Sequence, residues 1–498
     1  MTIPSQARAG RRLFLLIFGC LLTVVTAQNL GTPRNAGPDE PAHIVRGAGL
    51  VRGEVFGDMS YGEWLDAGNP PLDAGGADIV NADPDSDDIQ VYDVPRWVAQ
   101  PSATCFAHNP DVPATCSLVD VARGDGAIST APSYPIWSHI LPGLATLVVH
   151  SSSALWLARL LHAIVPVVLI AATLAHLLAT RRQAAASAVL LATTPMVLFV
   201  LAVVNPSGVV IAGAIAVWVT LDDLLRTGRA PWWLLTIGYG ALVLPRNDGL
   251  IWAALIVGLL ALVWRRNPVT LWPALPARNR IAVVAISVVG AAWAAFSGGG
   301  LVPVAKPDNF VDQVFMNTGQ HLREAVGVLG WLDTPLPESM YALWFFAAGL
   351  VVMITLVTRE YMRALGAAAA LALFVVAGWV LEIVQGRTAG LFWQGRYALP
   401  VLVGMVIVAA MGTDVDRKVG AIAAALPGAL ALVVWNVAFF QQLRRWAVGT
   451  HGSIRPWAWD TWDTPVPIPL VIVVHVAASV ALAWLCWAPR RTDASIGS

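Results

Sequence analysis

Long apolar segments alternate with polar ones along most of the chain. A helix needs about 17 to 25 apolar residues to cross a hydrocarbon core of roughly 30 Å, and it satisfies its own backbone hydrogen bonds there. Twelve segments have this character, near 13–30, 153–179, 184–204, 207–225, 231–247, 249–264, 280–297, 340–358, 362–384, 397–412, 419–441 and 470–488. The pattern therefore predicts an all-α integral membrane protein with about twelve transmembrane helices.

The polar segments are short on one side of the predicted membrane and long on the other, where long connections usually carry function. A further apolar stretch at 134–150 is interpreted as a helix on the outer surface, because counting it as a span would move Arg181 and Arg182 outside. The predicted parts are 1–30 (N-terminus and first helix), 31–152 (a large first extracytoplasmic loop), 153–297 (helices two to seven), 298–339 (a second such loop) and 340–498 (helices eight to twelve, with extracytoplasmic loops 385–396 and 442–469).

Basic residues gather on the side with the short loops, as at Arg11, Arg12, Arg181 and Arg182. Positive charge on short loops marks the cytoplasmic side, so we expect both termini to be inside. An alternative for the start is a cleaved secretory signal, because Val25-Thr26-Ala27 follows the first apolar run. Eleven further spans favour an uncleaved first helix.

The composition agrees with a membrane protein, since 57% of residues are hydrophobic and only 12% are charged. Soluble domains have about 25% charged residues. The formal net charge is zero, with 31 basic and 31 acidic residues, which argues against a nucleic-acid partner. Only Lys306 and Lys418 are lysines among the basic residues, and Ala, Val and Gly are abundant. This usage is typical of GC-rich coding and indicates a bacterial plasma membrane.

The sharpest local motif is GPDEPAH at 37–43, just beyond the first predicted span. A carboxylate at the boundary of water and lipid is partly desolvated, which suits Asp39 or Glu40 to act as a general base. If the chain turns helical after Pro41, His43 can return toward the carboxylates. Two alternatives stay open: an acidic helix cap, and a metal site, for which a second histidine is missing nearby.

Two arginines lie near the outer end of the ninth span, because the tripeptide Gln-Gly-Arg occurs twice and ends at Arg387 and Arg396. A guanidinium binds phosphate through a planar fork, so the pair could hold a lipid phosphate, with Gln394 and Tyr397 beside it. Arg246, at the outer end of the fifth span, is a third candidate. The alternative is that these arginines snorkel and anchor helix ends.

Trp331 and Asp333, in GWLDTPLP, are candidates for sugar binding by stacking and hydrogen bonding, and a similar pattern recurs in WDTWDTPVP at 459–467. Interfacial tryptophan that anchors the protein in the membrane is the alternative.

Cys105 and Cys116 are the cysteines outside the predicted spans. We expect a disulfide between them in an oxidising exterior, with two free thiols as the alternative.

The acidic run NADPDSDD at 81–88 has the alternating aspartates of a calcium loop, but it lacks the glycine and terminal glutamate of an EF-hand. It is interpreted as a solvated acidic loop, with a weak calcium site as the alternative.

Four of these pieces together form a recognisable pattern, namely PDEPAH, NPSG at 205–208, GWLDTPLP and WQGRYALP. With the large first outer loop and the dozen spans, the chain resembles the bacterial polytopic family "domain of unknown function 2142" over nearly its whole length. That family in turn is similar to the GT-C glycosyltransferase superfamily.

This resemblance implies an enzyme that transfers a sugar from a polyprenyl-phosphate donor to a cell-envelope glycan, lipid or protein on the extracytoplasmic face, with inversion. By the same resemblance Asp39 is the base, Glu40 orients the acceptor or a divalent cation, and His43 supports the pair. A divalent cation is the one cofactor that it admits, and membrane lipids are the other partners.

Two alternatives from other classes are a transporter or flippase of lipid-linked glycans and a non-catalytic protein of envelope assembly. Transporters usually carry ionisable residues near the midplane and inverted repeats with broken helices, of which the sequence shows no clear sign.

Overall fold

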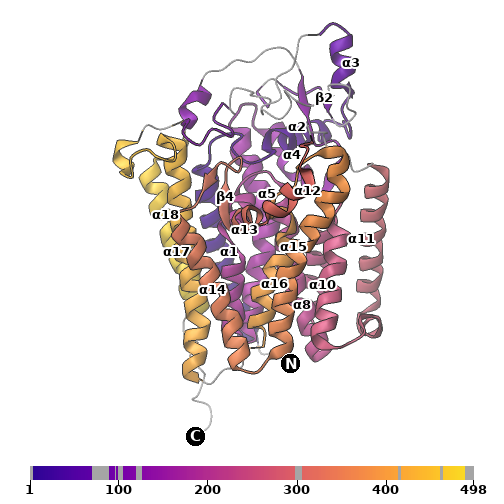
Figure 1. Cartoon of the computed structure of the whole chain (residues 1–498), viewed down its shortest axis with the longest axis vertical. Helices are drawn as coiled ribbons and strands as arrows, with labels where there is room; N and C mark the ends of the chain where they lie inside the picture. Colours follow the sequence, from indigo (N-terminus) through magenta and orange to yellow (C-terminus); the bar gives the residue numbers. More distant parts are fainter. Residues whose placement is uncertain are drawn as a thin grey trace.

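A computed structural model describes residues 4–69, 89–95, 97–98, 105–118, 126–297, 306–412, 417–459, 462 and 464–487. The acidic run at 81–88 lies outside these residues. Eight described helices are long and apolar enough to cross a membrane. They are α1 (Pro4–Leu30), α5 (Ala154–Ala179), α8 (Pro206–Thr227), α11 (Ala277–Phe296), α14 (Glu338–Val357), α15 (Tyr361–Ala389), α17 (Arg417–Val448) and α18 (Ile468–Trp487). They stand upright in one bundle (Figure 1).

Three shorter apolar helices complete the bundle: α9 (Trp232–Val243), α10 (Gly249–Trp264) and α16 (Leu399–Ala410). With 12, 16 and 12 residues, they are shorter than most of the spans expected from the sequence. The helical membrane architecture is clear from these elements, and the number of twelve crossings stays a prediction.

The expected straight span at 184–204 is instead two helices, α6 (Gln183–Ala192) and α7 (Pro195–Ala202), which meet at an angle of 68°. The chain breaks here because Pro195 has no N–H to continue the helix and disfavours helical geometry in the residue before it. Thr194 caps α7 by accepting a hydrogen bond from Val197 N, and its hydroxyl donates to Ala325 O at 2.8 Å. A broken helix is therefore present where a single span was expected.

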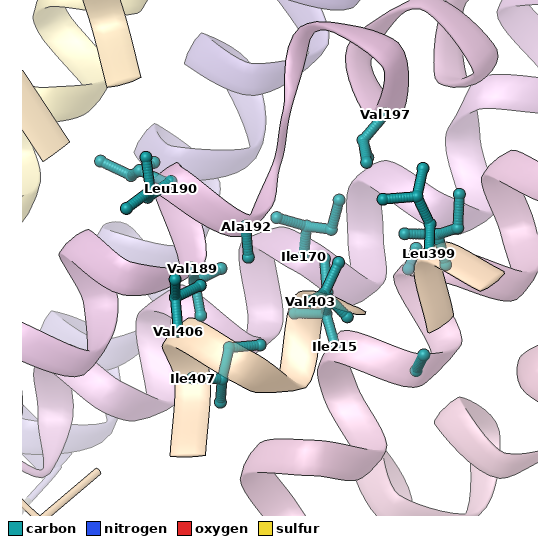
Figure 2. Close-up of a cluster of buried hydrophobic side chains, with 14 of the residues drawn as sticks. Ile170, Val189, Leu190, Ala192, Val197, Ile215, Leu399, Val403, Val406 and Ile407 are labelled. Carbon is teal, nitrogen blue, oxygen red and sulfur yellow. The ribbon is translucent and has the colours of Figure 1, made fainter. Parts of the chain in front are cut away.

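The core of the bundle surrounds α8, and 94% of the apolar segment of this helix is buried. Side chains of α5, α6, α7, α8 and α16 point into one cluster, including Ile170, Val189, Ile215 and Val403 (Figure 2). Gly404 of α16 leaves room for Trp218 of α8, which would collide with any larger residue there. Close helix contact through small residues is the usual way to pack helices in a membrane.

The long loops fold over one end of the bundle, whereas α1 begins and α18 ends at the opposite end (Figure 1). The first loop contains α2 (Glu40–Leu50), α3 (Tyr61–Asp66) and an antiparallel sheet in the order β1-β2-β3. The remaining elements are β1 (Met59–Ser60), β2 (Gln90–Tyr92), β3 (Ala127–Ser129), η3 (Ala114–Leu118), η4 (Ile136–Ser138), η5 (Pro268–Ala274), α12 (Phe310–Met316), α13 (Thr318–Gly327), β4 (Val328–Leu329), β5 (Thr334–Pro335), η6 (Gly395–Ala398) and η7 (Pro456–Ala458).

The apolar stretch at 134–150 contains α4 (Ile140–Val148), which has nine residues. At 1.5 Å per residue it is about 14 Å long and cannot cross a membrane. Leu141, Leu144 and Val148 are exposed, while the opposite side packs on α2 and α5. This short helix therefore lies across the end of the bundle with an apolar face left open.

Candidate functional site

A buried ion pair organises the segment that follows α1. Arg159 of α5 binds both carboxylate oxygens of Glu40, at 2.7 and 2.6 Å, and neither side chain is exposed to solvent. Arg159 also donates to Thr32 O and Pro33 O, at 2.8 and 2.7 Å. It thereby ties the carbonyl groups after α1 to the start of α2.

Glu40 accepts two further hydrogen bonds, from Val204 N at 2.9 Å and Gly37 N at 3.3 Å. Both of its oxygens are therefore committed to internal partners. The expectation that Glu40 orients an acceptor or a cation disagrees with this geometry, and we assign it a structural role instead.

Asp39, the neighbouring residue, points elsewhere. Its backbone has φ 60° and ψ 6°, a left-handed conformation that few residues other than glycine adopt. A helix-capping residue normally has extended geometry, and Asp39 makes no side-chain cap hydrogen bond to α2. Its carboxylate Oδ2 instead accepts a hydrogen bond from Arg396 Nη2 at 2.7 Å, and the side chain remains 36% exposed. The helix-cap interpretation of this side chain is therefore wrong.

Arg396 is almost fully buried, with 1% exposure. Only Nη2 has a hydrogen-bond partner among the described residues, and both Nε and Nη1 are buried without one. A buried charged group with unpaired donors is costly unless something completes its bonding. Nε and Nη1 point from different edges of the guanidinium, so each can donate to a separate acceptor atom.

Hydrogen bonds from the neighbouring backbone to Glu324 and Glu382 fix the position of Arg396. Gly395 N donates to Glu324 Oε2 at 2.7 Å, and Trp393 N donates to Glu382 Oε1 at 3.1 Å. A side chain at Gly395 would collide with the carbonyl of His321, so only glycine fits here. The backbone on the N-terminal side of Arg396 is thus held by Glu324 and Glu382.

Tyr397 joins the two arginines of the site. Its ring lies under the guanidinium of Arg246, at 4.6 Å, and close to that of Arg396, at 5.2 Å. Arg246 is held by Asp248 through Nε and Nη2, each at 3.0 Å. Cation-π contacts of this kind help to hold a guanidinium in place, and the Nε and Nη2 edge of Arg246 is occupied by Asp248.

A cavity of about 180 Å³ opens beside these residues. Its polar wall comprises Ser133, Tyr134, Arg246, Asn247, Asp248, Gln385 and Tyr397. Its other wall is mainly apolar and comes from α10, α15 and the loop before η6, with Ile251, Leu381, Phe392 and Trp393. The cavity therefore has one polar wall, in which Arg246 is paired with Asp248, and one mainly hydrophobic wall.

Gln394 lies beside Arg396, and its side-chain Oε1 is buried without a hydrogen-bond partner among the described residues. Arg387 lies in the last turns of α15, and its side chain is outside the described part of the structure. Its role in holding a lipid phosphate therefore stays a prediction.

His43 does not return toward the carboxylates, in contrast to the expectation from sequence. Its Nδ1 lies 3.1 Å from Nε2 of His139, and its ring packs edge-on against Tyr134 at 4.9 Å. Burial, followed by the nearby His139 and Arg396, holds the pKa of His43 well below its usual range. Burial also raises the pKa of Tyr134, so both groups are neutral.

Trp331 and Asp333 belong to a separate buried cluster. Trp331 Nε1 donates to Asn35 O at 3.0 Å, and Asp333 accepts hydrogen bonds from Arg445 at 2.8 Å and Thr334 at 2.9 Å. Because these internal partners occupy their polar groups, we assign both a structural role in place of the expected sugar binding.

The same cluster holds the loop that contains the disulfide between Cys105 and Cys116. Arg445 Nη2 donates to Phe106 O and Asn109 O, at 2.7 and 2.9 Å. Arg445 thus links this loop to Asp333 and α17.

No three His, Cys, Asp or Glu side chains in the described ranges lie close enough together to hold a metal ion. The positive charge that the described residues offer at this site comes from Arg246 and Arg396.

A family model described as "Predicted membrane protein (DUF2142)" matches residues 20–405, which is more than half of the chain. The chain belongs to this family. The match confirms the resemblance read from PDEPAH, NPSG, GWLDTPLP and WQGRYALP, all of which lie within the matched residues. No curated protein and no solved structure matches the chain.

Sequence reasoning missed three residues that build the site of this DUF2142 protein: Arg159, Tyr134 and His139. Arg159 had a signal, because an arginine six residues into a predicted span is costly unless it has a partner inside the protein. Tyr134 and His139 lie in a stretch interpreted as a surface helix, and only the fold shows that they face His43.

Glu40→Gln removes the charge that neutralises Arg159 inside the protein. Removing one partner of a buried ion pair usually costs about 3–5 kcal/mol. We therefore expect a clearly lower melting temperature, measured in detergent by tryptophan fluorescence. The matched control is Glu338→Gln, which removes an exposed ion pair with Arg323 at 2.8 Å. Exposed pairs contribute about 0–1 kcal/mol, and equal stability losses in the two variants would contradict the structural role of Glu40.

Proposed function

We propose that this membrane protein is a glycosyltransferase that takes a sugar from a polyprenyl-phosphate donor and transfers it to a cell-envelope acceptor. One observation carries the proposal: the exposed carboxylate of Asp39 is paired with the buried Arg396, 357 residues away in sequence. Each partner can still make hydrogen bonds, since Asp39 Oδ1 accepts none from the described residues and Arg396 has two unpaired donors. A proton acceptor thus lies beside an anion-binding group.

The proposed reaction uses the acceptor oxygen of Asp39 and the unpaired donors of Arg396. The hydroxyl oxygen of the acceptor attacks the anomeric carbon, and its proton passes to Asp39 Oδ1. The bond from that carbon to the phosphate oxygen breaks, and the polyprenyl phosphate leaves with the bonding electrons and one more negative charge. Arg396 meets this charge through one of its two unpaired donors. A single in-line displacement of this kind inverts the anomeric centre.

The cavity supports a lipid-linked donor over a nucleotide sugar. Tyr397 lines the cavity and contacts Arg396, so the phosphate would lie at this polar wall, and the apolar wall between α10 and α15 would contact the first prenyl units. Trp393 is packed between these two helices, against Trp252 at 6.4 Å and against Gly378. The wall of the cavity between α10 and α15 is thus built from hydrophobic side chains.

We propose that this end of the bundle is extracytoplasmic in a bacterial plasma membrane and that both termini are inside, because basic residues gather at the opposite end. Single cysteines at Asp308 and Arg266 test this. We expect a membrane-impermeant thiol reagent to label the first position and not the second in intact cells. Labelling at Arg266 alone would reverse the orientation.

A transporter of lipid-linked glycans is the second candidate, and the broken pair α6 and α7 is the observation that favours it. The buried charged groups argue for the enzyme, since they lie near the two ends of the bundle. Glu40 and Arg159 are at one end, and Asp222, paired with Arg363 at 3.1 Å, is near the other. A panel of polyprenyl-phosphate sugars and envelope acceptors, incubated with purified protein in lipid nanodiscs, distinguishes chemical transfer from movement.

Asp39→Asn keeps the shape of the side chain and its contact with Arg396 but removes the proton acceptor. We expect turnover to fall by about two orders of magnitude or more, as loss of a general base usually costs, while donor affinity changes little. Steady-state kinetics over a range of donor concentrations measures both. Full turnover in this variant would remove Asp39 from the reaction.

Arg396→Lys replaces a guanidinium, whose donors point in fixed directions, with a point charge. We expect turnover to fall by about tenfold or more, because only contacts that strengthen in the transition state raise the rate. Arg323→Lys is the matched control, since Arg323 is exposed and outside the site. Wild-type kinetics for both variants would show that Arg396 only anchors the end of a helix.

A further inference from the structure

His43 is the first member of a fixed chain of hydrogen bonds. Its Nδ1 lies 3.1 Å from His139 Nε2. On the far side of the second ring, His139 Nδ1 lies 3.0 Å from the carbonyl oxygen of Pro135 and 3.2 Å from the hydroxyl of Ser138. Both histidines are buried.

The carbonyl of Pro135 sets the direction of this chain, because a carbonyl oxygen can only accept. His139 Nδ1 must therefore carry the proton that it donates to Pro135 O. Burial lowers the pKa of His139 to about 3, so this ring is neutral and its Nε2 is unprotonated. His43 Nδ1 must then carry the proton between the two rings. His43 is neutral as well, which leaves its own Nε2 as a bare acceptor with no partner among the described residues.

A close crossing of two helices holds the rings in this register. His43 precedes Gly47 by one helical turn, and His139 precedes Gly143 by one turn. A side chain at Gly143 would collide with the carbonyl of Gly47, and one at Gly47 would lie 2.9 Å from His139 O. The two glycines bring α2 and the start of α4 together, and so the histidines meet one turn earlier.

The surroundings of His43 favour a hydroxyl as its ligand. Arg396 is close enough to disfavour a proton on the ring, so His43 is a poor base. A phosphate oxygen carries lone pairs and negative charge, which the lone pair of Nε2 repels. A hydroxyl can donate a hydrogen bond to it without transferring a proton.

We propose that His43 Nε2 is a hydrogen-bond acceptor for a hydroxyl group of the sugar on the lipid donor. This assignment rests on the proposed function and adds a sugar-recognition residue to it. The anion is then bound by Arg396, and the sugar is recognised by His43. Asp39, four residues before His43 in the sequence, keeps the role of base.

The first test does not depend on activity. Protein labelled with ¹⁵N-histidine in nanodiscs is measured by NMR at neutral pH, and the His43 signals are assigned by their loss in His43→Gln. The exposed His451 is the reference for an ordinary ring. We expect His43 to be protonated at Nδ1 and bare at Nε2. A proton on Nε2, or a cationic ring, would overturn the proposal.

The second test measures binding of a short polyprenyl phosphate, with and without the sugar that the transfer panel selects. We expect His43→Leu to weaken the sugar-bearing lipid about tenfold, which is the scale of one lost hydrogen bond, and to leave the bare lipid unchanged. His43→Gln should retain most of the affinity, because its amide oxygen can replace Nε2. His451→Leu should bind both lipids as wild type does.

The outcomes separate this inference from the proposed function. Equal weakening of both lipids in His43→Leu would show a purely structural residue and would overturn the inference alone. A wild-type protein that binds neither lipid would overturn the proposed function and the sugar assignment with it, and the NMR result would still decide the state of His43.

Discussion

The site depends on the buried ion pair between Arg159 and Glu40. Desolvating two charges is costly, and the cost is offset only when geometry and additional hydrogen bonds are good. Here the guanidinium is bound by two carboxylate oxygens and by the carbonyls of Thr32 and Pro33. The pair therefore determines the path of the chain between α1 and α2. Asp39 is the residue before Glu40, so its position follows from the position of this pair.

Two adjacent carboxylates thus have opposite roles because their surroundings differ. Glu40 is enclosed and accepts four hydrogen bonds, whereas Asp39 is partly exposed and accepts one from another side chain. The left-handed backbone of Asp39 separates them, since it turns one side chain away from the helix that the next one enters. A cost of about 1–3 kcal/mol for such a conformation is common at functional sites.

The apolar periodicity of the sequence was sufficient to predict a helical membrane protein and the position of most helices. Asp39, Arg246, Arg396 and Tyr397 were also chosen as candidates from the sequence, Asp39 for its acidic motif and the others because charged and aromatic residues at a helix end are conspicuous. The break at Pro195 was missed, since a proline within an apolar run can be read as a tolerated kink. The roles of Glu40 and Asp333 were missed for another reason: their partners, Arg159 and Arg445, are more than a hundred residues away in sequence.

The pairing of Asp39 with Arg396 also couples the two halves of the proposed reaction. Before transfer, the carboxylate partly neutralises the positive charge of the arginine through the 2.7 Å hydrogen bond. When Asp39 accepts the proton of the attacking hydroxyl, it becomes neutral and its attraction for Arg396 weakens. At the same stage the leaving phosphate gains a negative charge. The electrostatic interaction that Asp39 gives up therefore becomes available to the phosphate when the transition state needs it, which is the condition for raising the rate.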